Sequence, residues 1–271
     1  MNNPQFVHLR MHSEFSIVDG IVRIKEAVKA AAADAMPALA LTDLNNFFGL
    51  LKFYDAARAN GIKPILGADV WIEGENDESP SRLILLIKNV EGYRALSRLL
   101  TKAFANLGNK DFATISRAWL TKADCQHLIA LSGGVFGEIG NALLNNNQKD
   151  AERKALFWAE LFPDSFYLEV QRFGQANAEV FVQKSVQLAN ALNLPLVATH
   201  PIQFLKDEQF LAHEVRVCIA EGEVLSNPKR QKHFTEDQYF KSQIEMAALF
   251  KDLPEALQNL SLIHISEPTR R

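Results

Sequence analysis

Seven short apolar runs rich in β-prone residues alternate along this 271-residue chain with longer stretches of helical periodicity. The runs are almost continuously apolar, as buried parallel strands are. We expect strands at Phe6–Leu9, Ala38–Thr42, Pro64–Trp71, Leu83–Ile87, Leu128–Leu131, Phe166–Val170 and Leu196–Thr199. Helices are expected at Val22–Ala33, Leu50–Asn60, Glu91–Phe104, Lys149–Leu161 and Asn177–Leu192. This alternation predicts an α/β fold and favours a parallel barrel over a sandwich, although the length also allows an open sheet.

The composition excludes several classes of protein. Apolar residues make up 48% of the chain and charged residues 23%, which is typical of a globular protein rather than a disordered one. The net charge of −3 argues against DNA binding through a broadly basic surface. Cys125 and Cys218 lie far apart, so neither a disulfide framework nor a cysteine-based zinc site is indicated. Without a secretory segment or an apolar run of about 18 residues, we expect a cytoplasmic protein with no membrane partner.

Polar residues recur where the expected strands end. The first strand runs into a turn that carries His8, Arg10, His12 and Asp19, and this cluster alone fits a metal site or a solvated loop equally well. Later strands also end in polar or turn residues, at Thr42-Asp43, Gly67-Ala68-Asp69, Ser132-Gly133-Gly134 and Thr199-His200-Pro201. Parallel α/β folds build their sites at the carboxyl ends of strands, so a site is expected there.

Several motifs in order resemble a known family. They are His8–Gly20, Leu41–Asn46 with Gly49, Gly61–Gly67, Lys88–Tyr93, Leu131–Gly133 with Gly137-Glu138, and Ala212–Glu214. Over residues 5–259 the chain is similar to the polymerase-and-histidinol-phosphatase (PHP) domain at the N-terminus of bacterial replicative DNA polymerase III alpha subunits. The resemblance implies a distorted seven-stranded parallel (β/α)7 barrel, in agreement with the strand count.

In metal-binding members of that family, nine positions at the strand ends hold divalent metals. The resemblance places His12 and Asp19 at two of them and Asp69 where the family has glutamate. The other six positions have lost the family's ligand; they are Arg10, Leu44, Arg82 and Gln203 in place of histidine, Gly134 in place of a cysteine or similar ligand, and Pro201 in place of aspartate. Leucine, glycine and proline side chains offer no donor, and arginine has no lone pair. We therefore predict that the metal cluster is lost and that this domain has no metal, cofactor or catalytic residue.

The two arginines suggest what replaced the metals. Removing divalent cations would leave partly buried carboxylates unpaired, at a cost of several kcal/mol for each ion. We hypothesise that Arg10 and Arg82 form a structural ion-pair network with Asp19, Asp43 or Asp69. The alternative is that both guanidinium groups face water at the barrel mouth.

Other chemically distinctive residues have simpler interpretations. His200 is expected to be a hydrogen-bonded structural group rather than a metal ligand, and His213 a capping or packing residue. Ser132-Gly133-Gly134 is interpreted as a tight turn and Cys218 as a core residue. The basic run at residues 229–233 is interpreted as a solvated loop that could alternatively touch DNA. The acidic stretch at residues 73–81 is expected to be an exposed loop.

The end of the chain breaks the pattern. Residues 260–271 look like translated sequencing-adapter read-through, so we expect the PHP domain to span residues 1–259, followed by a non-native tail on a truncated fragment. The alternative is a genuine capping segment in which Leu262, Ile263 and Ile265 cover apolar surface.

Two functional classes therefore compete. In the first, the resemblance implies a metal-free scaffold that binds the proofreading exonuclease and other subunits of a replicase. The parent would contact DNA and polymerise nucleotides with Mg²⁺, through catalytic carboxylates beyond residue 271. In the second, the chain is an active metal-dependent phosphoesterase or 3′-exonuclease, as intact members of the superfamily are.

Overall fold

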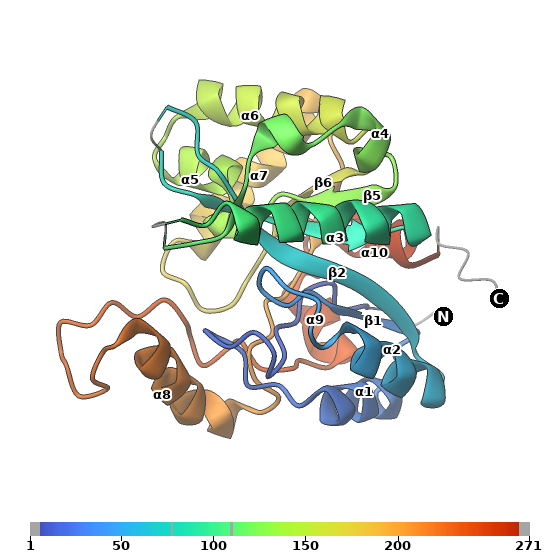
Figure 1. Ribbon diagram of the computed structural model, residues 1–271, viewed down its shortest axis with the longest axis vertical. Coiled ribbons are helices and arrows are strands. Elements are labelled where there is room, and N and C mark those ends of the chain that lie inside the picture. Colours follow the sequence, from blue (N-terminus) through green and yellow to red (C-terminus); the bar gives the residue numbers. More distant parts are fainter. Residues whose placement is uncertain (1–5, 77, 109–110, 266–271) are drawn as a thin grey trace.

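The computed structural model describes residues 6–76, 78–108 and 111–265, which form one curled sheet surrounded by helices (Figure 1). The sheet order is β1-β2-β3-β5-β6-β7, and β4 pairs with β2 outside this path. The strands are β1 Ala38–Leu41, β2 Lys63–Ile72, β3 Ser81–Ile87, β4 Thr114–Ile115, β5 Leu128–Leu131, β6 Phe166–Val170 and β7 Leu196–Ala198. The predicted α/β fold with a barrel-like sheet is therefore confirmed.

The prediction that the sheet is entirely parallel is wrong. β3 runs antiparallel to both of its neighbours, with Asp69 opposite Ile84 on one side and Leu85 opposite Ala130 on the other. The remaining neighbours in the path are parallel. The physical reason is the connection between Ile72 and Ser81, which is shorter than the dozen or so residues that a parallel crossover needs.

The first predicted strand forms no ladder within the described residues. Its backbone is nevertheless buried and bonded on both sides: Ala40 N donates to His8 O at 2.9 Å, and Ile202 N donates to Arg10 O at 3.3 Å. Met11 and Ile202 form a single parallel bridge. Because Ala40 belongs to β1 and Ile202 follows β7, the segment lies between the two edges of the sheet. It thereby closes the barrel and positions the polar residues that follow it.

The described helices cover the sheet on several sides (Figure 1). They are α1 Ile24–Ala33, α2 Leu50–Ala59, α3 Val90–Ala105, α4 Lys122–Cys125, α5 Glu138–Leu144, α6 Gln148–Leu161, α7 Ala178–Leu192, α8 Phe210–Glu221, α9 Gln243–Leu249 and α10 Pro254–Ile265. The five predicted helices correspond to α1, α2, α3, α6 and α7. In the view of Figure 1, α8 and the loop after it stand apart from the other labelled elements.

Local sequence explains where individual helices begin and end. The predicted stop after α2 is present, because Gly61 takes a left-handed φ of 73° directly after the C-cap Asn60. The Asn89 side chain caps α3 by accepting from Gly92 N at 3.1 Å. The connection from Gly133 to Phe136 is a tight turn, with left-handed φ values of 82° and 59° at its two glycines.

The predicted boundary after residue 259 falls inside α10. Leu260 and Ile263 are buried in the main apolar core, and Asn259 Nδ2 donates to Leu196 O of β7 at 2.7 Å. Leu262 is 57% exposed. The described part of the tail therefore packs on the barrel, and its non-native origin stays a prediction. Residues 266–271 lie outside the described part of the chain.

Both cysteines are buried and free, and Cys218 lies in the core as predicted. Within the described ranges, none of the helices combines the length and the apolar character that crossing a bilayer requires.

Candidate site at the barrel mouth

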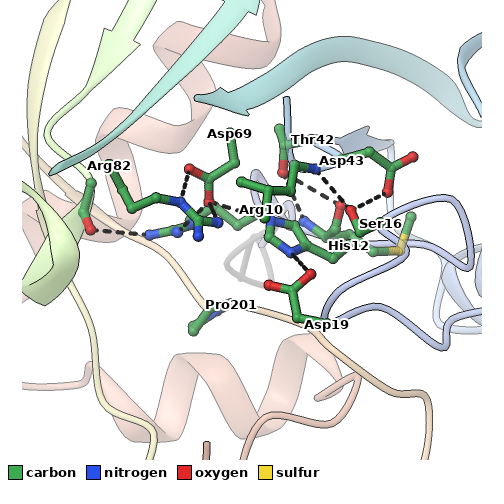
Figure 2. A network of polar contacts seen from close by, with 12 residues as sticks. Arg10, His12, Ser16, Asp19, Thr42, Asp43, Asp69, Arg82 and Pro201 are labelled. Atoms are coloured by element: carbon green, nitrogen blue, oxygen red, sulfur yellow. Dashed lines mark hydrogen bonds and ion pairs between the residues drawn. The ribbon is translucent and has the colours of Figure 1, made fainter. Parts of the chain in front are cut away.

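Asp69 is the centre of a buried ion-pair network (Figure 2). Its carboxylate has no solvent exposure and accepts two bonds of 2.7 Å from Arg82, from Nε to Oδ1 and from Nη2 to Oδ2. Arg10 Nη2 donates to Oδ2 from another direction, also at 2.7 Å. The structure therefore contains the predicted network, and Asp69 is the carboxylate that both arginines share.

The pleat of the sheet explains why Arg82 reaches Asp69. Asp69 and Trp71 are two residues apart on β2 and so share one face, and Arg82 of β3 is paired with Trp71. The guanidinium lies over the Trp71 ring, 4.7 Å from its centroid, and forms its bidentate pair with the diagonal neighbour Asp69. The antiparallel direction of β3 is therefore what brings these side chains together.

Electrostatics keep this network ionised. Burial by itself raises the pKa of Asp69, but the positive charges of Arg82 and Arg10 outweigh burial and hold that pKa well below its usual range. Burial disfavours the charge on Arg82 in the same way, and Asp69 reverses this effect and raises the pKa of Arg82.

Glu169 is a member of the site that the sequence interpretation missed. It lies in β6 with no exposure, and its Oε1 is 3.5 Å from Arg10 Nη1. It also accepts from Gly133 N at 2.6 Å and from Thr199 Oγ1 at 2.7 Å. Burial raises its pKa and Arg10 lowers it. The available signal was a glutamate in the middle of the apolar run Phe166–Val170, because buried carboxylates need a partner.

His12 connects Asp69 to Asp19 (Figure 2). Its Nδ1 is 2.9 Å from Asp19 Oδ1, and its Nε2 is 3.3 Å from Asp69 Oδ2. Burial disfavours the imidazolium, but Asp19 and Asp69 outweigh burial and raise the pKa of His12 to about 9. The amide of Gln203 lies 3.4 Å from His12 Nδ1. Protonated His12 is therefore the positive partner of Asp19.

Asp43 was one of the three predicted partners of the arginines, and it bonds to serines instead. It accepts from Ser13 N at 2.6 Å, from Ser13 Oγ at 2.8 Å and from Ser16 Oγ at 3.0 Å. These bonds oppose the effect of burial, which raises the pKa of Asp43. Its role is to hold the turn after the first segment, and Ser13 and Ser16 were not singled out from the sequence.

Three of the positions that the resemblance assigns to metal ligands contribute shape rather than donor atoms. The backbone of Leu44 forms a bridge with Asp69, and Pro201 lies beside the network (Figure 2). Gly134 has a φ of 59°, and a Cβ at this position would lie 2.2 Å from Gln171 Oε1. The left-handed backbone therefore favours glycine here.

The donor set does not fit the divalent cluster that the family implies. Across the three described ranges, no group of three or more histidine, cysteine, aspartate or glutamate side chains is arranged to hold a metal ion. At the centre of the site, both oxygens of Asp69 already accept from guanidinium groups. A metal at Asp69 would have to displace Arg10 and Arg82 and then lie beside their charges.

Two other histidines are hydrogen-bonded within the fold. His200 Nε2 is 2.9 Å from Tyr239 O and His213 Nε2 is 2.7 Å from Asp19 O, and both rings are buried, as predicted. The prediction of a solvated basic loop at residues 229–233 is partly wrong. Arg230 is buried and pairs with Glu214 of α8.

Comparisons with known proteins agree with this fold. The profile of the PHP domain family matches residues 8–173, more than half of the chain. The chain is 48% identical over 255 residues to DNA polymerase III subunit alpha of Pseudomonas fluorescens, covering 94% of this chain and 22% of that protein. For the Escherichia coli (strain K12) protein of the same name, the identity is 42% over 261 residues, with 96% and 22% covered. The chain thus spans just over a fifth of these relatives.

A solved structure supports the fold alone. An amidohydrolase from Chromobacterium violaceum superposes with a TM-score of 0.50 at 18% sequence identity, covering 73% of this chain and 87% of the other.

Proposed function

Because the chain belongs to the PHP domain family, we propose that it is the PHP domain of a bacterial replicative DNA polymerase III alpha subunit. In this proposal it is a metal-free scaffold that binds the proofreading exonuclease subunit. Two relatives at 42% and 48% identity carry the alpha-subunit name, which supports the assignment to a replicase. DNA-directed polymerisation and its Mg²⁺ belong, in this proposal, to the larger part of such a protein.

The observation that carries the scaffold role is the saturation of Asp69 by two arginines. A hydrolytic site of this family needs metal-bound water at the strand ends, and metals need free lone pairs from deprotonated donors. Here the lone pairs of Asp69 accept from Arg10 and Arg82. The network instead ties together β2, β3 and the first segment, which suits a structural role.

The competing function is a metal-dependent phosphoesterase or 3′-exonuclease. It is favoured by the fact that His12 remains in contact with both Asp19 and Asp69. Metal analysis of the purified protein separates the two functions. We expect far less than one zinc or manganese per chain, with no phosphatase or 3′-exonuclease activity in the presence of Mn²⁺ or Zn²⁺. Stoichiometric metal with activity that a chelator abolishes would establish the competing function.

Exonuclease binding has its own test. The purified protein is mixed with the proofreading exonuclease subunit and passed through a sizing column with and without a chelator. We expect one complex of unchanged elution volume in both buffers, because no metal holds the scaffold together. A complex that dissociates on chelation, or no complex at all, contradicts this part of the proposal.

A further inference from the structure

A cavity of about 330 Å³ opens between the loop that follows β2 and the helices α5 and α6. Gly74, Glu78 and Ser79 of the loop form one wall, and residues of α5, of α6 and of the connection between them form the other. Figure 1 shows this loop beside both helices. The cavity is distinct from the Asp69 network, because none of the described residues that line it belongs to that network.

Ser81, the first residue of β3, brings an unpartnered hydroxyl to this cavity. The residue is only 4% exposed, yet its hydroxyl makes no hydrogen bond to any described residue. Asn141 and Asn145 line the same cavity, and within the described ranges their side-chain amides are free as well. Buried polar groups normally have a hydrogen-bond partner, so the Ser81 hydroxyl points to a molecule inside the cavity.

Lys154 of α6 supplies a further donor. Its side chain is 4% exposed, and its ammonium donates to Glu78 Oε2 and to Asp150 Oδ2, both at 2.8 Å. An ammonium has three N–H donors, so one remains after these two bonds. The wall of the cavity thus combines a fixed donor with hydroxyl and amide groups that both donate and accept.

The carboxylates around the cavity are already paired. The pairs are Glu138 with Arg117, Glu78 with Lys154, and Asp150 with Lys154 and Arg153. A cationic ligand would have to displace these side chains from their carboxylates. An anionic ligand would face three carboxylates, while Lys154 is the one cation among the described residues of the wall. The charges therefore favour a neutral ligand.

The wall also offers no surface for an aromatic ring. None of the described residues that line the cavity is aromatic, and Ala142 carries the one apolar side chain among them. Aromatic ligands gain much of their affinity from apolar and aromatic walls. Hydroxyl groups both donate and accept, as the free serine and asparagine side chains do, so a ligand rich in hydroxyl groups matches this wall.

We propose that this cavity binds a small neutral polyol, a sugar or a sugar alcohol, between the loop after β2 and the helices α5 and α6. Ser81, Asn141 and Asn145 bond to its hydroxyl groups, and the remaining N–H of Lys154 donates to one of its oxygens. The ion pairs around the cavity stay intact. Each new bond replaces a bond to water and contributes little, so binding is expected at millimolar concentration.

The test is a titration of the isotope-labelled 271-residue chain with trehalose and with sorbitol, followed by NMR of the side-chain amides. Asn141→Ala and Asn145→Ala identify the two signals. We expect both signals to shift and to saturate with at least one of the two polyols, and the comparison shows whether the cavity takes the sugar or the sugar alcohol. Exclusion of polyols from protein surfaces is general and does not saturate, so saturation reports a site.

Ser81→Ala tests the buried hydroxyl. The affinity should fall at least about fivefold, because one hydrogen bond to the ligand is lost. Ser185→Ala is the matched control, since Ser185 of α7 is also buried, at 2% exposure, and does not line the cavity. Its affinity should stay the same. Asn145→Ala, at an exposed position, should also weaken binding, as read from the Asn141 signal, and it carries the test if Ser81→Ala does not fold.

Each other outcome overturns the inference. Shifts that rise without saturation, or an affinity that Ser81→Ala and Asn145→Ala leave unchanged, mean that water alone occupies the cavity. Saturation by putrescine or inorganic phosphate, but by neither polyol, assigns the cavity to an ion. Equal weakening by Ser81→Ala and Ser185→Ala means that the loss acts through the fold and not through the cavity wall.

Discussion

Two arginine–carboxylate networks in this molecule use the same chemistry in different surroundings. At the barrel mouth, Asp69, Arg10 and Arg82 have side-chain exposures of 0%, 4% and 11%. The second network joins the segment after β2 to α6, through Glu75, Glu78 and Glu138 on one side and Arg117, Arg153 and Lys154 on the other. Its exposures range from 4% at Lys154 to 53% at Arg153.

The difference shows that exposure to solvent determines how much an ion pair contributes to the free energy of unfolding. Water screens the outer pairs of the second network, and exposed pairs contribute at most about 1 kcal/mol each. In the first network, removal of one partner leaves the other charged in a dry site, which costs several kcal/mol. The acidic stretch at residues 73–81, expected to be an exposed loop, is therefore tied to α6 by weak contacts, and Ser81 at its end is buried in β3.

The largest expected effect is that of Asp69→Asn. Two buried guanidinium groups lose their shared counter-charge, so the free energy of unfolding should fall by about 3–5 kcal/mol. Urea denaturation at pH 7 measures this change. Asp150→Asn is the control, because Asp150 pairs with Arg153 and Lys154 of the second network at 20% exposure, and it should cost about 1 kcal/mol or less. Equal losses would remove the distinction between the two networks.

The first network should make the stability of the fold depend on pH. The folded pKa of His12 is about 9, above its usual value of 6.5, so its contribution is fully present below pH 6.5 and is lost as the pH rises through about 9. The total contribution of His12 to the free energy of unfolding is on the order of 3 kcal/mol. Asp69 has the opposite sign: its depressed pKa gives stability above pH 3.8 that is lost in acid.

Urea denaturation between pH 7 and pH 10 checks the sign for His12, because above pH 7 the other buried histidines are neutral in both states. The chain should become less stable over this range, and His12→Gln should flatten the curve. An unchanged slope in His12→Gln would mean that another group is responsible for the pH dependence.

The geometry of the buried pair should matter as well as its charge. Arg82→Lys keeps the positive charge but loses the fork that donates to both oxygens of Asp69, so a loss of about 1–2 kcal/mol is expected. Arg153→Lys, in the exposed part of the second network, should change stability by less than about 0.5 kcal/mol. Thermal unfolding of both variants under one set of conditions tests whether the fork matters only where water is excluded.

A small effect is also expected for Arg153→Ala. Its partners Glu75 and Asp150 remain solvated, so the loss should stay below about 1 kcal/mol and shrink further at high salt. Unfolding in low and high salt measures this. A large loss that does not depend on salt would show that the second network behaves like a buried one.

Part of the site could be predicted, because the donor atoms that a side chain offers are a property of residue identity. Leu44, Gly134 and Pro201 offer no donor atom in any fold, and arginine has no lone pair wherever it lies. The choice of Asp69 over Asp19 and Asp43 could not be predicted, because it depends on distances across the sheet. Glu169 was missed for the same reason, since its partner Arg10 is distant in the chain and meets it only in the folded barrel.

The sequence by itself determined the α/β class, the positions of most strands and helices, and the arginine–carboxylate chemistry at the barrel mouth. These features follow from local periodicity and from the atoms that each side chain carries. Only the tertiary structure decided the antiparallel direction of β3 and the closure of the barrel by the first segment. The physical reason is that these features depend on which segments meet in space, and contacts between distant segments leave no periodic pattern in the chain.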